Sequence, residues 1–194
     1  MEFLKKYYII NKYSELISVL EIQVFFQEAG MRQIQILEIQ DVLKSISQVE
    51  KKDFKEIYQE FQDIQPELLD YLSSICKNRH FSDEEKSFVS ILALNIWQIT
   101  RTFYPVQPLI RKERVFEIHE KNMKYQKNLF FLNDFQFQKA LNEMSSDHPQ
   151  KPLFVYITSI IMNIKSFQVP EKNAGIMLIY LKTLLESFHD GLCA

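Results

Sequence analysis

Glu186 and His189 have the spacing best suited to metal chemistry, three positions apart near the carboxyl end of the sequence. On a helix this spacing places a carboxylate and an imidazole on one face, as in the metal-binding pairs of di-iron helical bundles. Such a site needs a second pair and two further carboxylates, and the sequence offers one pair only. Lys182 falls on the same face one turn earlier, where it would repel a metal ion and pair with Glu186. We therefore predict a solvated ion pair at this face and no metal site.

Asn95, His119 and Asn122 are polar residues set within or beside apolar helical patterns. A buried amide without partners costs about 1–3 kcal/mol, so we expect both asparagines to be hydrogen-bonded if they are buried. One interpretation is that the amides fix the alignment of packed helices. The alternative is that Asn95, His119 and Asn122 converge on an internal polar pocket that binds a small ligand. The first interpretation is favoured, because pairing across a helix interface is the commoner use of such amides.

No familiar catalytic motif occurs in the sequence. The phosphate-loop, dinucleotide-binding and α/β-hydrolase patterns are absent, and the four histidines are scattered. The two cysteines, Cys76 and Cys193, are too far apart in sequence for a zinc or redox motif. We predict no catalytic residues, no cofactor and no metal, and we expect a reducing, cytoplasmic setting.

The charge balance argues against nucleic acid as a partner. Lys and Arg number 23 against 25 Asp and Glu, so the basic excess of a nucleic-acid binder is missing. No apolar run reaches the roughly 18 residues of a membrane span. Basic residues do gather between 111 and 127, but Glu113, Glu117 and Glu120 interleave with them. Such mixed charge is typical of a solvated or partner-facing surface, and we hypothesise that this face docks on an acidic partner.

The segment 83–103 is predicted to be the central helix. It is apolar almost all the way round and carries Trp97, the only tryptophan. A helix of this kind is normally surrounded by others. Ser82 and Glu85 form a capping box at its start, and Pro66 suits the first turn of the preceding helix.

The segments on either side of residues 65–103 are also predicted to be helical. Ile36, Ile39, Leu43 and Ile46 form a helical stripe. Alternating apolar residues within 18–40 permit a short β-hairpin as the competing interpretation. After 103, Pro105 and Pro108 predict a rigid link. A long helix then follows, with an apolar seam whose members are Val115, Ile118, Asn122, Tyr125, Leu129 and Leu132.

A weak internal repeat relates 65–103 to 150–189. Leu68, Tyr71, Ser74 and Ile75 match Leu153, Tyr156, Ser159 and Ile160 at a constant offset of 85. We read the two stretches as helical hairpins sharing one core. The matches are few, and two unrelated amphipathic hairpins would share some of them.

Scarce glycine, with three residues in 194, and abundant aromatic residues indicate an all-α fold. We predict one all-α domain, a bundle of about seven or eight helices spanning 1–194. Its parts are an N-terminal stretch (1–46), a first helical unit (47–103), a proline link with a long helix (104–133) and a second helical unit (134–194). The expected function is a non-enzymatic protein-interaction or regulatory module that binds a protein partner or self-associates as a homodimer. The alternative is a small-molecule-binding bundle with a pocket near Asn95, His119 and Asn122.

Overall fold

The computed structural model describes residues 32–48, 51–77, 81–129, 134–146, 148–163 and 171–193. Within these ranges the chain forms eight helices and no strand, so the all-α prediction is confirmed. The helices are α2 (Ile36–Ser47), α3 (Lys51–Ile64), α4 (Pro66–Cys76), α5 (Asp83–Phe103), α6 (Lys112–Leu129), α7 (Asp134–Ser146), α8 (Lys151–Asn163) and α9 (Glu171–Cys193).

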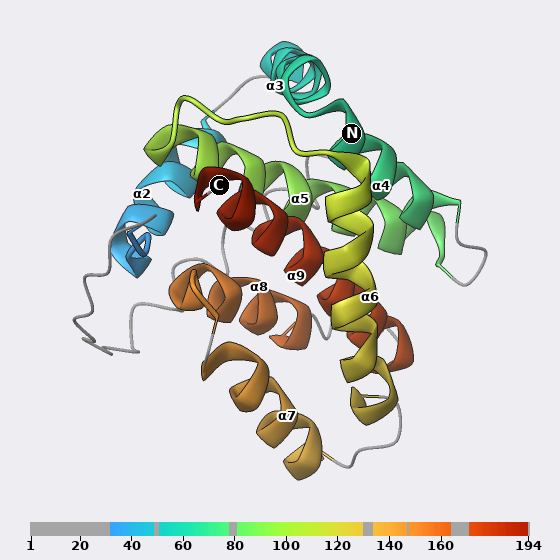
Figure 1. The fold of residues 1–194 in the computed structure, drawn as a ribbon. Helices are drawn as coiled ribbons and strands as arrows, with labels where there is room; N and C mark the ends of the chain where they lie inside the picture. Colours follow the sequence, from blue (N-terminus) through green and yellow to red (C-terminus); the bar gives the residue numbers. More distant parts are fainter. Residues whose placement is uncertain are drawn as a thin grey trace.

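Helix α5 runs through the middle of the molecule, as its apolar sequence predicts (Figure 1). Its first turn is closed by the predicted capping box, in which Glu85 N–H donates to Ser82 Oγ at 3.2 Å and Ser82 N–H to Glu85 Oε2 at 2.7 Å. Trp97 is fully buried, and its ring stacks on Phe61 of α3 at 4.8 Å and lies 5.7 Å from Phe188 of α9. These three rings join α3, α5 and α9 at the centre of the core.

Helix α9 lies beside α5 and makes up the other half of the centre. Figure 1 shows α3 and α4 on one side of this pair and α7 and α8 on the other, with α6 crossing α9. Helix α6 packs mainly on α9 and also on α4, while α2 bridges α5 and α8. None of the described helices is both long and apolar enough to cross a membrane.

The N-terminal alternatives are settled in part. Helix α2 begins at Ile36, so the hairpin interpretation is wrong for 36–40, and residues 18–31 lie outside the described residues. The predicted stripe is buried at Ile39, Leu43 and Ile46. The segment is a helix and not a strand because helical spacing places these side chains on one face of α2, which packs on α5 and α8.

Each half of the predicted repeat folds as a pair of helices, α4–α5 and α8–α9. In each half the two helices pack on each other, and α5 also packs on α9. Two hairpins around one core is the arrangement that a duplication would produce, but similar pairs can arise without one. The repeat therefore stays a prediction.

Candidate functional site

The three residues of the predicted polar pocket lie on two helices. Asn95 is buried on α5, whereas His119 is half-buried and Asn122 fully buried on α6. The principal packing partners of α6 are α9 and α4, and those of α5 are α2, α9, α4 and α3. The polar contacts of His119 and Asn122 accordingly go to α4 and α9. A ligand-binding role for the three residues stays a prediction.

Asn122 is the centre of a buried polar group between α6 and α9. Its Nδ2 donates to Glu186 Oε2 at 2.6 Å and to Thr183 Oγ1 at 3.2 Å. Glu186 in turn accepts from the ammonium of Lys182. We call these four residues the polar seam. The two bonds of Asn122 run across the α6–α9 interface, whereas the bond of Lys182 to Glu186 lies within α9. Joining two packed helices is the alignment role expected of a core amide.

The prediction that Lys182 and Glu186 pair on a solvated surface is wrong, because the pair is largely buried. The two side chains do pair, but Lys182 is only 5% exposed, because α6 packs over this face of α9. Tyr125 of α6 contributes to that cover: its ring lies 5.7 Å from Lys182 Nζ. Tyr125 is itself 36% exposed, so the apolar seam predicted for α6 fails at this position. Burial lowers the pKa of Lys182, and the bond with Glu186 opposes that shift.

His119 belongs to an aromatic cluster at the α4–α6–α9 junction. Its Nδ1 lies 2.8 Å from Tyr71 Oη, and its ring stacks on Tyr180 at 5.3 Å. Burial lowers the pKa of His119 and raises the pKa of Tyr71, so at neutral pH the phenol stays protonated and the imidazole stays neutral. In the tautomer that carries its proton on Nε2, His119 Nδ1 accepts this bond from Tyr71 Oη.

Glu186 and His189 have different hydrogen-bonding partners. Glu186 is engaged by Lys182 and Asn122, while His189 Nε2 lies 3.7 Å from Cys193 Sγ at the end of α9. Across the described part of the chain, no group of three or more histidine, cysteine or acidic side chains is arranged to hold a metal ion.

A second feature stands out between α5 and α6, where the chain runs without helix from 104 to 111. We call residues 105–110 the proline strap. It contains Pro105 and Pro108, and its exposed large hydrophobic side chains are Val106, 86% exposed, and Leu109, 62% exposed. Ile110, by contrast, is only 5% exposed. The strap thus turns most of its apolar surface to solvent while one isoleucine anchors it.

The strap is fixed by Gln65, a fully buried residue between α3 and α4. Gln65 Nε2 donates to the carbonyl oxygen of Pro108 at 2.7 Å, and its Oε1 accepts from Ile110 N–H at 3.1 Å. One amide side chain therefore satisfies the backbone of two strap residues, as a neighbouring strand would. The side of the strap that faces the protein is hydrogen-bonded at these two residues.

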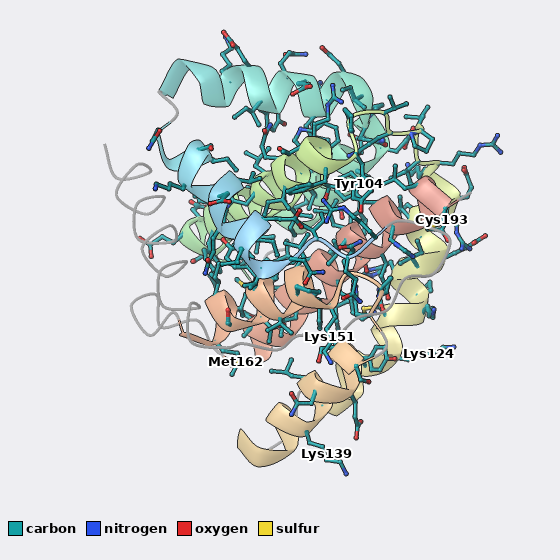
Figure 2. The ribbon with its side chains drawn as sticks, turned by 90° about the vertical axis from the view of Figure 1, so that its left-hand side faces the viewer. Tyr104, Lys124, Lys139, Lys151, Met162 and Cys193 are labelled. Atoms are coloured by element: carbon teal, nitrogen blue, oxygen red, sulfur yellow. The ribbon has the colours of Figure 1, made fainter. Side chains whose placement is uncertain are left out.

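Further contacts hold the two ends of the strap. Arg101 donates to the carbonyl oxygen of Pro105 and pairs with Glu60 of α3 at 3.1 Å. At the other end, Ile110 packs against Gly191 of α9: a Cβ at Gly191 would lie 2.9 Å from Ile110 Cγ1. Figure 2 shows Tyr104 and Cys193 toward the strap end of the molecule, far from Met162 and Lys139.

An equivalent anchor occurs ahead of α2. Gln150, also fully buried, accepts from Ile34 N–H at 3.0 Å and donates to the carbonyl oxygen of Arg32 at 2.9 Å. In both cases a glutamine bridges a carbonyl and the N–H two residues on, and a buried isoleucine precedes the next helix by two residues. We call residues 32–35 the N-terminal segment. Gln65 and Gln150 differ by the offset of 85 that relates the two predicted hairpins, an observation in favour of the repeat.

The start of α6 is tied to the end of α9 by charge. Arg114 makes a two-bond pair with Asp190, at 2.7 and 2.5 Å, and a further bond to Glu117 at 2.8 Å. The guanidinium holds the pKa of Asp190 below its usual value. Arg114 is thus engaged within the chain, whereas Arg111 and Lys112 are exposed beside the strap. Docking of this basic face on an acidic partner stays a prediction.

Sequence reasoning found the polar seam in part and missed the strap as a surface. Asn122 signalled the seam because it interrupts an apolar pattern. The two prolines at 105 and 108 were visible, but they predicted only a rigid connection. Gln65 and Gln150 carried no signal, because a glutamine before a helix is normally a solvated residue.

The chain was also compared with known proteins. It matches no protein-family model, no curated protein and no solved structure.

Proposed function

We propose that this protein is a non-enzymatic interaction module that binds a protein partner through its proline strap. The observation that carries the proposal is that Val106 and Leu109 are exposed on a backbone held in place by the buried Gln65. Exposed apolar side chains on a fixed backbone favour association, because little conformational freedom is lost on binding. We further propose a cytoplasmic setting.

The N-terminal segment supplies an internal control for this argument. It has the same glutamine anchor and the same buried isoleucine, but its exposed residues, Arg32 and Gln35, are polar. Anchoring a segment ahead of a helix therefore does not require exposed apolar side chains. Val106 and Leu109 need another explanation, and contact with a partner is the simplest one.

The polar seam supports a structural role over catalysis. Asn122 bonds Thr183 and Glu186 across the α6–α9 interface, and Glu186 pairs with Lys182 within α9. Catalysis would instead need an acid, a base or a nucleophile directed at a bound substrate.

The test is a quantitative affinity purification from the cells that make the protein. Wild type, Val106→Ser/Leu109→Ser and the control Leu37→Ser are compared at equal amounts of bait. Leu37 is an exposed leucine, 68% exposed, on α2 and outside the strap. We expect at least one protein to be recovered with wild type and control and to fall about tenfold, or 1.4 kcal/mol, with the strap variant. If no recovered protein depends on the strap residues, the proposal is wrong.

Small-molecule binding is the second candidate function, and one observation favours it. Asn122 Oδ1 is buried and has no hydrogen-bond partner among the described residues. A ligand donor near His119 could satisfy it. A metabolite library screened by thermal denaturation would then contain a compound that raises the midpoint of wild type and not of Asn122→Ser. The same shift in both proteins, or no shift at all, would contradict this candidate.

A further inference from the structure

Within the described residues, the eight helices form two sets of four that follow each other along the chain. We call residues 32–103, with α2 to α5, the N-half, and residues 108–193, with α6 to α9, the C-half. In each half the third helix begins directly after an anchoring glutamine, Gln65 or Gln150. The fourth helix is the longest of each set, with 21 residues in α5 and 23 in α9. The correspondence thus extends from the two predicted hairpins to all the described helices.

Most helix pairs that pack in one half have a counterpart in the other. Helix α2 packs on α5 as α6 does on α9, α3 on α4 as α7 does on α8, and α4 on α5 as α8 does on α9. Between the halves, α4 packs on α6 as α8 does on α2, and α5 packs on α9. Figure 1 shows α2 and α6 on opposite sides of the central α5–α9 pair, and α3 and α7 at opposite ends of the molecule. This is the pattern of a twofold dimer, in which both partners use the same surface.

The strongest contacts between the halves are also reciprocal. Gln65 of the N-half holds the start of the C-half, and Gln150 of the C-half holds the N-terminal segment. In the core, the ring of Trp97 in the N-half lies 5.7 Å from the ring of Phe188 in the C-half. The central core is therefore shared between the halves, and each half covers an apolar face of the other.

The connection between the halves is short and carries an energetic cost. The carbonyl oxygen of Pro105 accepts a bond from α5, and that of Pro108 accepts from Gln65. Between these two held points lie Val106 and Gln107. Both amide atoms of the Gln107 side chain are buried and have no hydrogen-bond partner among the described residues, which is unfavourable for an amide. A short connection with a local cost of this kind favours the exchange of halves between two chains.

Exchange would replace each contact between the halves by the same contact between two chains. The balance between closed monomer and exchanged dimer then depends on the connection and on the protein concentration. A short linker gives an effective concentration in the millimolar range, which favours the closed monomer. The buried amide of Gln107 opposes closure, because a straightened connection would return this side chain to water.

We propose that the N-half and the C-half are equivalent four-helix units, and that two copies of this chain exchange them to form a dimer. The partner is a second copy, and the surfaces that join the two chains are those that join the halves within one chain. This exchange is independent of the proposed function, which concerns the outward face of the strap.

The experiment uses the full chain, unfolded in urea and refolded at protein concentrations from about 10 µM to about 1 mM, where the effective concentration of a short linker is reached. Molar mass is measured by light scattering after size-exclusion chromatography. Wild type is compared with Gln107→Leu and with the control Gln59→Leu, which changes an exposed glutamine on α3. We expect wild type to form a dimer whose fraction rises with concentration and that persists on dilution, because separation requires the shared core to open.

Gln107→Leu should shift the balance about tenfold toward monomer, because the closed connection no longer buries an unpaired amide. Gln59→Leu should behave as wild type does. An unfolding midpoint at or above the wild-type value would show that Gln107→Leu folds.

Three results would overturn the inference: wild type is monomeric at every concentration, its dimer dissociates at once on dilution, or Gln107→Leu forms as much dimer as wild type. Leu109→Ser separates exchange from association through the strap. An exchanged dimer forms equally well in this variant, whereas loss of the dimer would mean that two copies bind through the strap and that exchange is wrong. None of these results decides whether another protein binds the strap, which the affinity purification tests.

Discussion

The proline strap and the N-terminal segment are two connections built on one plan. Each is held by a buried glutamine that bonds a carbonyl and the N–H two residues later, and each has a buried isoleucine two residues before the next helix. They differ in what they show to solvent. The N-terminal segment exposes Arg32, whose guanidinium pairs with Glu38 at 2.8 Å. The strap exposes two prolines, a valine and a leucine.

This difference separates architecture from function. The glutamine and the isoleucine that the two segments share hold the backbone ahead of α2 and α6, so we assign them an architectural role. Of the two segments, only the strap has exposed apolar side chains. They are not needed to hold the backbone, because the N-terminal segment is held without them. We therefore place the proposed partner contact on the exposed apolar face of the strap, and four predictions test the contrast between the two segments.

The largest effect is expected away from both segments, in the polar seam. Glu186→Leu removes the partner of Lys182 and an acceptor of Asn122. Removing one member of a buried ion pair costs about 3–5 kcal/mol, so urea denaturation should show a loss of this size. The double variant Lys182→Met/Glu186→Leu should regain much of that loss, because no unpaired charge remains. If Lys182→Met/Glu186→Leu is as unstable as Glu186→Leu, the loss does not come from the unpaired charge of Lys182, and this explanation of the polar seam is wrong.

The glutamine anchors come next and test the shared plan directly. Gln65→Leu leaves one carbonyl and one N–H without a partner, which should cost about 2–4 kcal/mol in the free energy of unfolding. Gln150→Leu should cost less, about 1–3 kcal/mol, because the carbonyl of Arg32 keeps its bond from the Tyr104 hydroxyl and only Ile34 N–H is left without a partner. Only Gln65→Leu should also weaken partner binding, because only it releases the strap. Equal binding defects in both variants would remove the distinction between the two segments.

Acid should act on the N-terminal anchor more than on the strap. His148 Nδ1 accepts from Gln150 N–H at 3.0 Å, and burial lowers its pKa from 6.5 to about 3. In the unfolded chain His148 is therefore protonated below about pH 6.5, whereas in the folded chain it stays neutral down to about pH 3. The free energy of unfolding should fall with decreasing pH across this window, by up to about 1.4 kcal/mol per pH unit.

His148→Asn keeps an acceptor near Gln150 and removes the titration. Urea denaturation at pH 7 and pH 5 should show a smaller acid-induced loss in this variant than in wild type. Identical losses would mean that His148 is protonated at its ordinary pKa in the folded protein.

The smallest stability effect is expected at the strap surface. Val106 and Leu109 are largely solvated, and surface substitutions usually change stability by less than about 0.5 kcal/mol. Val106→Ser/Leu109→Ser should therefore denature at nearly the wild-type urea concentration while losing partner binding. A large loss of stability would show that the two side chains are packed and would weaken the case for a binding face.

The sequence predicted the helices well because each signal for them was local. The capping box at Ser82, the proline at 66 and the stripe on α2 all act within a few residues. The site was harder because it depends on distant contacts. Gln65 meets Ile110 across 45 positions, and Gln150 meets Ile34 across 116. Lys182 was misplaced for the same reason: its pairing with Glu186 is local, but its burial is decided by α6.

The central claim is that the apolar face of the strap, rather than exposed apolar residues in general, binds the partner. Its most direct test is the dissociation constant of the recovered partner for Val106→Ser/Leu109→Ser and for Leu37→Ser, each relative to wild type. The account predicts binding at least about tenfold weaker for the strap variant and unchanged for Leu37→Ser. Equal affinities for all three proteins would contradict it.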